Sequence, residues 1–193
     1  MSKKLDDVVI TSALRTPIGT YKGSLKNLSA DKLGALAIKE AVHKSNLKSE
    51  QIDEVIMGHV LTSGLGQNPA RQASINAGIP VSKPAHIVNQ VCGSGLRSIV
   101  SGFQSIKLEE DMIVVSGGQE NMSRAPHALF YRENKKLDES KLIDTMINDG
   151  LIDSFNHYHM GVTAENVAEK FEISRDEQDN FALNSQKKTQ EAI

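Results

Sequence analysis

The feature that most constrains the fold is a strand-to-helix turn around Cys92, the single cysteine of the 193 residues. An apolar extended segment, residues 86–91, precedes it, and a helical apolar repeat follows it. That repeat consists of Leu96, Ile99, Val100, Phe103 and Ile106. A helix N-terminus favours thiolate over thiol, and Gly93 and Gly95 leave room for a bulky substrate. The position suits a nucleophile, but a small buried residue at a strand end is the alternative, because free cysteines are usually buried.

Strands alternate with helices over the first 118 residues. Runs rich in β-branched and apolar residues predict strands at 8–13, 54–60, 86–91 and 111–118. Helices are expected from Leu28 to Asn46, with Asn68 as cap from Pro69 to Ala77, and after Cys92. The first helix is expected to bury Leu33, Leu36, Ala37, Ala41 and Val42. This order predicts an α/β fold of right-handed βαβ units around a mainly parallel sheet, with 8–13 as a buried first strand.

The chain is expected to have three parts. Residues 1–122 form the core, residues 123–160 form a long loop insertion that covers the active site, and residues 161–193 return to the core. The charged run 132–141 within the insertion favours a solvated surface. In the last part, Ser174 and Glu177 have the spacing of a capping box at the start of a helix.

Composition excludes several classes of function. Lys and Arg total 22 against 24 Asp and Glu, a net charge of −2, and Trp is absent, so we expect no nucleic-acid partner. One cysteine excludes an internal disulfide and a multi-cysteine metal site and suits a reducing compartment. The N-terminus has no apolar signal region and no stretch is apolar enough to span a bilayer. The sequence predicts a cytoplasmic protein without a metal or a membrane segment.

Six stretches together resemble one enzyme family. The segment 88–99, with Cys-Gly-Ser-Gly at its centre, is similar to the active-site signature of thiolases of the acetyl-CoA acetyltransferase type. The other stretches follow in the family's order along the whole chain. They are residues 15–19, 66–73, 117–123, 158–168 and 174–179. The resemblance implies the N-terminal half of the thiolase fold.

The resemblance also implies a reaction and a site. Cys92 matches the cysteine that carries an acyl group as a thioester between coenzyme A molecules, and its N–H would help to stabilise the oxyanion. Leu151, His159 and Met160 match positions that line the coenzyme A and acyl pocket. Coenzyme A is expected as a substrate, with no resident cofactor. Homodimers or homotetramers are expected of the full-length protein.

The family completes its site with motifs that do not occur in these residues. Asn-Glu-Ala, Gly-His-Pro and a second cysteine in Cys-Gly-Gly belong to a second half-domain, so we expect residues 1–193 alone to be inactive or nearly so. Two alternatives remain. One is a non-catalytic thiolase-fold remnant or partner subunit, which rapid alkylation of Cys92 would contradict. The other is a ketoacyl-synthase-like condensing enzyme, which the insertion at 124–160 disfavours.

Overall fold

The computed structural model describes residues 7–132 and 139–192, which belong to two compact units. We call residues 1–150 the sheet unit and residues 151–193 the helical unit, and each is described by itself. The predicted three-part division, with a return of residues 161–193 to the core, stays a prediction.

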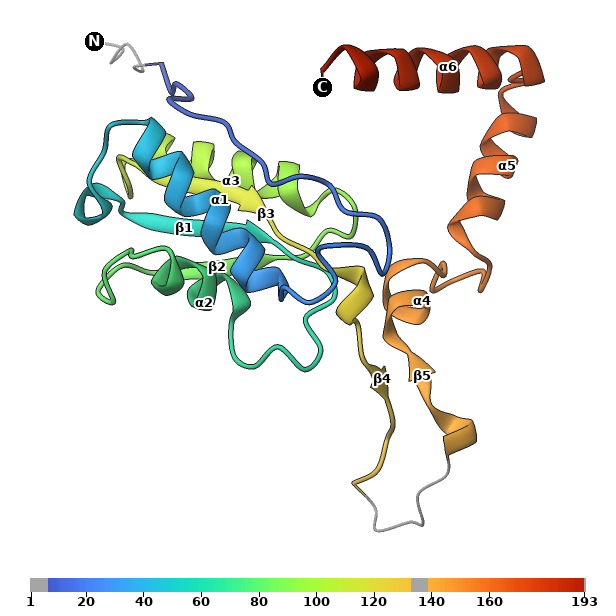
Figure 1. Ribbon diagram of the computed structural model, residues 1–193, viewed down its shortest axis with the longest axis horizontal. Helices are drawn as coiled ribbons and strands as arrows, with labels where there is room; N and C mark the ends of the chain where they lie inside the picture. The colour runs from blue at the N-terminus through green and yellow to red at the C-terminus, as the bar shows by residue number, and fades with distance from the viewer. Residues whose placement is uncertain (1–6, 133–138, 193) are drawn as a thin grey trace. The chain divides into compact units, whose positions relative to one another are not determined.

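A three-stranded parallel sheet is the centre of the sheet unit (Figure 1). Its strands are β1 (Glu54–Gly58), β2 (Ala85–Val88) and β3 (Val114–Gly118), in the order β2-β1-β3. The last residue of β1, Gly58, is in register with Val88 of β2 and Gly118 of β3. The carboxyl ends of all three strands therefore meet at one edge, which we call the carboxyl edge. The predicted parallel α/β fold is confirmed.

Three helices cover the sheet. They are α1 (Ala30–Lys44), α2 (Pro69–Asn76) and α3 (Ser94–Lys107). Val55 and Met57 of β1 join α1 and α2 in the buried core, whereas Gly58 approaches the start of α3. Alternate residues of a strand face opposite sides. The unit is therefore a sandwich with α1 and α2 on one face and α3 on the other (Figure 1).

Small residues make up most of the buried faces of α1 and α3, together with Ile38 and Val42 of α1. α1 buries Ala30, Asp31, Gly34, Ala35, Ile38 and Val42, and α3 buries Ser94, Ser98, Gly102 and Ser105. Leu36 of the predicted α1 stripe is 55% exposed, and Leu96 and Phe103 of the α3 repeat are also exposed. The helices were predicted correctly. In the predicted α1 stripe, Val42 is buried, Leu33, Ala37 and Ala41 are half-buried, and Leu36 is exposed. The prediction missed Gly34, Ala35 and Ile38, because small residues such as Gly34 and Ala35 allow the close packing of a helix on a sheet.

The predicted buried first strand is wrong. Residues 8–13 have no regular secondary structure, and Val9 and Ile10 are 72% and 78% exposed. The Ser12 hydroxyl donates to the Ala41 carbonyl at 2.8 Å, which attaches this segment to α1. A β-branched run forms a strand only when a neighbouring strand offers a hydrogen-bond ladder, and among the described residues none does so here.

The expected insertion contains a small antiparallel pair. The strands β4 (His127–Ala128) and β5 (Ile143–Asp144) pair with each other, and the short helix α4 (Thr145–Gly150) follows. Single-turn 3₁₀ helices occur at Ser49–Gln51, Met122–Arg124 and Glu139–Lys141. Most of the charged run 132–141 lies outside the described residues, so its predicted solvated state stays a prediction.

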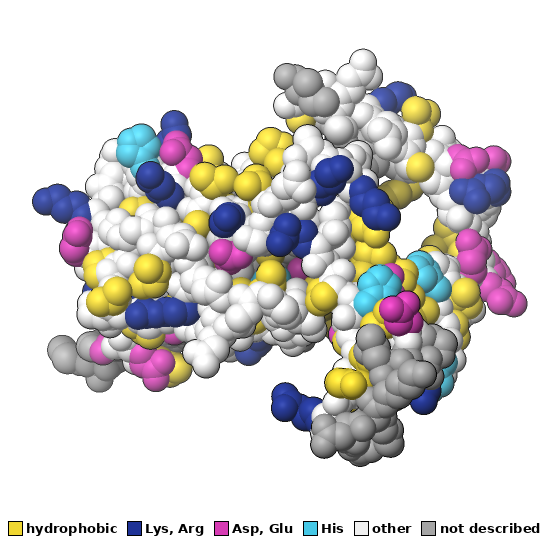
Figure 2. Space-filling view, turned by 60° about the horizontal axis from the view of Figure 1, so that its bottom comes forward, with side chains coloured by type: hydrophobic (Ala, Val, Ile, Leu, Met, Phe, Trp, Pro, Cys, Tyr) yellow, Lys and Arg dark blue, Asp and Glu magenta, His cyan; other side chains and the backbone are white. Residues whose placement is uncertain are grey.

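The helical unit contains α5 (Met160–Lys170) and α6 (Arg175–Glu191). The predicted capping box is confirmed, since the Ser174 hydroxyl accepts from the Glu177 N–H and Glu177 accepts from the Ser174 N–H. Among the helices described, none has the length and apolar character needed to cross a membrane. Charges of both signs are interspersed on the face shown in Figure 2, as the balanced composition leads one to expect.

Candidate active site

Cys92 lies exposed in the turn between β2 and α3. Its predecessor Val91 has a φ of 47°, in the left-handed region. A β-branched residue rarely adopts this conformation, because its side chain crowds the backbone. Such local strain often occurs at functional sites, where the surrounding structure maintains it. The turn therefore has two properties that a nucleophile needs, namely exposure and an enforced backbone geometry.

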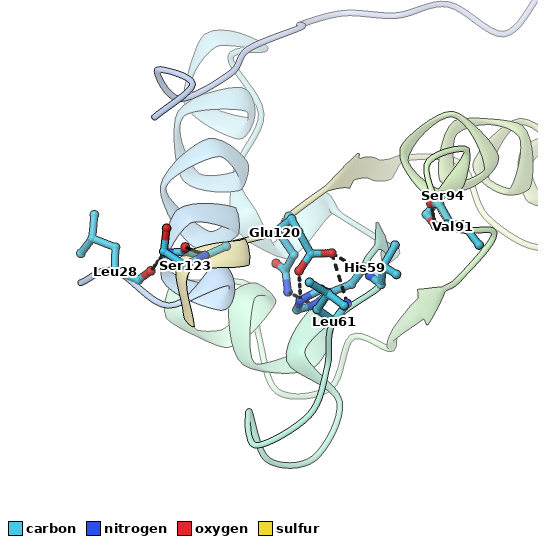
Figure 3. Close-up of polar contacts among 10 residues, drawn as sticks. Leu28, His59, Leu61, Val91, Ser94, Glu120 and Ser123 are labelled. Carbon is cyan, nitrogen blue, oxygen red and sulfur yellow. Dashed lines mark hydrogen bonds and ion pairs between the residues drawn. The ribbon is translucent and has the colours of Figure 1, made fainter. Parts of the chain in front are cut away.

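The Ser94 side chain holds this turn together (Figure 3). Its hydroxyl accepts from the Gln90 N–H at 2.8 Å and donates to the Val91 carbonyl at 2.5 Å. The Asn89 carboxamide oxygen accepts from the Val91 N–H at 3.0 Å. Ser94 is 4% exposed, so the two bonds of its hydroxyl are shielded from competing water. The hydroxyl thus fixes the two residues that precede Cys92.

Two glycines determine how closely other atoms approach the turn. A Cβ atom on Gly58 would lie 2.4 to 2.6 Å from backbone atoms of Ser94 and Gly95, so only glycine lets β1 approach the start of α3 this closely. A Cβ atom on Gly95 would meet nothing within 4 Å. The space beside Gly95 is therefore open, which agrees with the predicted approach of a substrate to the turn.

A buried histidine and a glutamate occupy the same carboxyl edge. His59 follows β1 and is 1% exposed, and its Nε2 lies 3.2 Å from Oε1 of Glu120, which follows β3. Burial raises the pKa of Glu120, but His59 and the N–H groups of Val60 and Leu61 outweigh it and leave the pKa below its ordinary value. Glu120 is therefore a carboxylate at neutral pH. No sequence motif connects His59 with Glu120, because the two residues lie 61 positions apart.

Side chains of the stretch 66–73 form hydrogen bonds with backbone groups of the sheet unit. The Asn68 side chain accepts from the Arg71 N–H at 3.1 Å, which confirms it as the cap of α2. The Arg71 guanidinium donates to the carbonyls of Lys83 and Val81. Gln72 donates to the Leu65 and Gln67 carbonyls at 2.7 and 2.8 Å. These contacts fix the loops on both sides of α2.

In the helical unit, the three predicted pocket residues lie together at the start of α5. The Met160 N–H donates to the Leu151 carbonyl at 2.8 Å. His159 is the N-cap of α5, and its Nδ1 accepts from the Gly161 N–H at 2.9 Å. Since Nδ1 accepts, the ring proton of neutral His159 is on Nε2. His159 is exposed, whereas Leu151 and Met160 are half-buried. One polar donor thus stands beside two apolar side chains.

Metal ligation has no candidate in the part of the chain that the structure describes. No group of three or more His, Cys, Asp or Glu side chains there has a metal-binding arrangement. The sheet unit contains a cysteine on a strained turn, and the helical unit contains a histidine that caps α5 next to apolar residues.

Comparison with known proteins defines the class. Residues 8–193 match the family model of the thiolase N-terminal domain. The chain is 52% identical over 189 residues to an acetyl-CoA acetyltransferase of Cupriavidus necator, covering 97% of this chain and 48% of that protein. It is 48% identical to a cytosolic acetyl-CoA acetyltransferase of Rattus norvegicus, covering all of this chain and 48% of the relative. The chain therefore belongs to the thiolase family.

A solved structure shows the same fold. The Acat5 thiolase from Ascaris suum, determined in complex with coenzyme A, superposes with a TM-score of 0.89 at 39% identity. The superposition covers 97% of this chain and 49% of that one. The chain spans about half the length of the curated relatives it matches. The predicted thiolase-like fold and family are thus confirmed.

Proposed function

We propose that the protein to which this chain belongs is an acetyl-CoA C-acetyltransferase, with Cys92 as its acyl carrier. The observation that carries the proposal is the exposed cysteine on the strained, Ser94-held turn ahead of α3, with open space beside Gly95. Membership of the thiolase family and relatives that are acetyl-CoA acetyltransferases support it. The same exposure favours this reading over a non-catalytic remnant, because a structural cysteine has no need of solvent access.

The proposed reaction is an acyl transfer in two steps. The Cys92 thiolate attacks the thioester carbonyl of acetyl-CoA, and the tetrahedral intermediate collapses as the bond to the coenzyme A sulfur breaks. Coenzyme A leaves as a thiol after taking up a proton from solvent, and the α-proton that the second acetyl-CoA loses to solvent balances it. A second acetyl-CoA, deprotonated at its α-carbon, then attacks the acetyl-cysteine, which releases acetoacetyl-CoA and restores the thiolate. Thiolysis is the reverse sequence. Coenzyme A enters and leaves as a substrate, so the scheme needs no resident cofactor.

We propose that Leu151, His159 and Met160 bind the acyl-CoA. The Nε2–H of His159 would donate to an amide carbonyl of the pantetheine arm, and the cap to Gly161 would hold the ring in that orientation. Leu151 and Met160 would contact the apolar parts of the substrate. A short acyl group such as acetoacetyl is the substrate that Met160 favours.

The oligomeric state, homodimer or homotetramer, stays a prediction that light scattering would check. The cytoplasmic location also stays a prediction, and cell fractionation would check it.

The test is thiolysis of acetoacetyl-CoA by the whole protein. Wild-type protein should consume acetoacetyl-CoA and coenzyme A, and its Cys92 peptide should gain the mass of one acetyl group after incubation with acetyl-CoA. Cys92→Ser should lose about 10³-fold or more in kcat, since a serine hydroxyl is not activated here. His159→Ala should raise KM several-fold with a smaller change in kcat. Wild-type protein that neither turns over nor acquires an acetyl group would contradict the proposal.

A further inference from the structure

The proposed chemistry makes no use of the His59 and Glu120 pair at the carboxyl edge. His59 comes directly after β1 and Glu120 two residues after β3, and Figure 3 shows the two side chains pointing toward each other. The His59 side chain is 0% exposed and that of Glu120 is 31% exposed. An ionisable group loses favourable hydration when it is buried, so a buried His beside a carboxylate needs compensating contacts.

Those contacts are present on both side chains of the pair. Oε2 of Glu120 accepts from the N–H groups of Val60 and Leu61 at 3.0 and 3.2 Å. Nε2 of Gln119 lies 3.2 Å from Nδ1 of His59. An amide nitrogen can only donate, so Nδ1 accepts and the ring proton is on Nε2, facing Glu120. Nε2 and Oε1 are 3.2 Å apart, so the Nε2–H group lies against the carboxylate, although the alignment is poorer than that of a good hydrogen bond.

The backbone of His59 connects this network to the strand that leads to Cys92. The His59 N–H donates to the Val88 carbonyl at 3.1 Å, at the end of β2. The Gly58 carbonyl accepts from the Gln119 N–H at 3.0 Å. Gly58 in turn lies against the backbone of Ser94. A shift of His59 would therefore displace both Val88, which precedes the strained turn, and Ser94, which holds it.

We propose that His59 and Glu120 are positioning residues for Cys92. Neither needs to touch the substrate. The pair connects the residues that follow β1 and β3. Through the His59 backbone, it holds the turn after β2 in place against the start of α3. The kcat and KM measurements rest on the proposed function, because they use acetoacetyl-CoA as the substrate. The alkylation measurement does not, because the reactivity of the Cys92 thiol can be measured without any acyl-CoA.

The experiment compares two replacements of His59 in the whole protein. His59→Gln keeps a donor close to the position of Nε2, whereas His59→Leu has a similar volume and no donor. Each variant is assayed for kcat and KM with acetoacetyl-CoA, for the rate constant of Cys92 alkylation by iodoacetamide, and for its melting temperature. All rates are measured well below the lowest melting temperature.

His59→Leu should lower kcat about tenfold with KM within about twofold, and should lower the Cys92 alkylation rate about fivefold. His59→Gln should stay within about twofold of wild type in both rates. A His59→Leu protein with a lower melting temperature but wild-type kcat and alkylation rate would overturn the proposal, because the pair would then act on stability alone.

If His59→Leu does not fold, Glu120→Gln replaces it. Glu120→Gln weakens the pair and should lower both rates several-fold, and wild-type rates in that variant would also overturn the proposal. Wild-type protein without turnover would contradict the proposed function, while the alkylation rates would still decide this inference.

Discussion

The two units of the chain obtain their structure in different ways. The sheet unit has a buried core that includes Ile38, Val55, Met57 and Ala73, drawn from α1, β1 and α2. In the helical unit, neither α5 nor α6 has a buried residue, and their starts are set by the side chains of His159 and Ser174. Long-range packing therefore determines the first region, whereas local capping determines the helix starts of the second.

Because the two units depend on different interactions, a substitution should lower stability more in the sheet unit than in the helical unit. In the sheet unit, a single added methyl group can collide with the backbone of an element distant in sequence. The close-packed surroundings cannot relax enough to relieve the strain. In the helical unit, the same change alters one local hydrogen bond. We therefore expect the cost of well-chosen substitutions to fall from the carboxyl edge of the sheet to the start of α6.

The largest effect is expected for Gly58→Ala. The added Cβ would lie 2.4 to 2.6 Å from backbone atoms of Ser94 and Gly95, so β1 and α3 must separate. Overpacking of this kind should lower the free energy of unfolding by about 3 kcal/mol, measured by urea denaturation of the whole protein. The matched control is Gly95→Ala, which meets no atom within 4 Å and should cost nothing or stabilise α3 slightly. Equal stability of the two variants would contradict the close approach.

The Gly58 contact also shows what sequence could not predict. The glycine-flanked turn at Cys92, the Asn68 cap and the Ser174 box were predictable, because each depends on residues close in sequence. The buried face of α1 was predicted in part and that of α3 was not, since a repeat of large apolar residues gives the period of a helix but not which side meets the sheet. The His59 contact with Glu120 joins the ends of two strands, and it required the sheet order.

A smaller effect is expected at Glu120 when the pH falls. Its pKa in the folded protein is below the ordinary value of 4.5, so the carboxylate is the stabilising form. That stability is fully present above about pH 4.5 and is lost as the pH falls through the folded pKa. Glu120→Gln cannot ionise, so its free energy of unfolding should fall less steeply than that of wild type between about pH 5 and pH 3.

The comparison at low pH needs two references. Glu50→Gln, a change of an exposed glutamate, should keep the wild-type slope. Asp53 also has a lowered pKa, chiefly because its carboxylate accepts from the Met112 N–H, so Glu120→Gln should flatten the acid slope only in part. A Glu120→Gln slope equal to that of wild type would show that the His59 pair contributes nothing to the stability of the carboxyl edge.

The smallest effect is expected for Ser174→Ala at the start of α6. The substitution removes the hydroxyl that accepts from the Glu177 N–H, a cap contribution of about 1 kcal/mol. Because no packing compensates or amplifies the loss, it should stay local and speed amide exchange in the first turns of α6 about fivefold, with the exchange of β1 unchanged. Ser185→Ala, a replacement at an exposed position within the same helix, should leave exchange equal or slower. If Ser174→Ala also exposed the amides of β1, the helical unit would be coupled to the sheet core and the contrast between the two regions would fail.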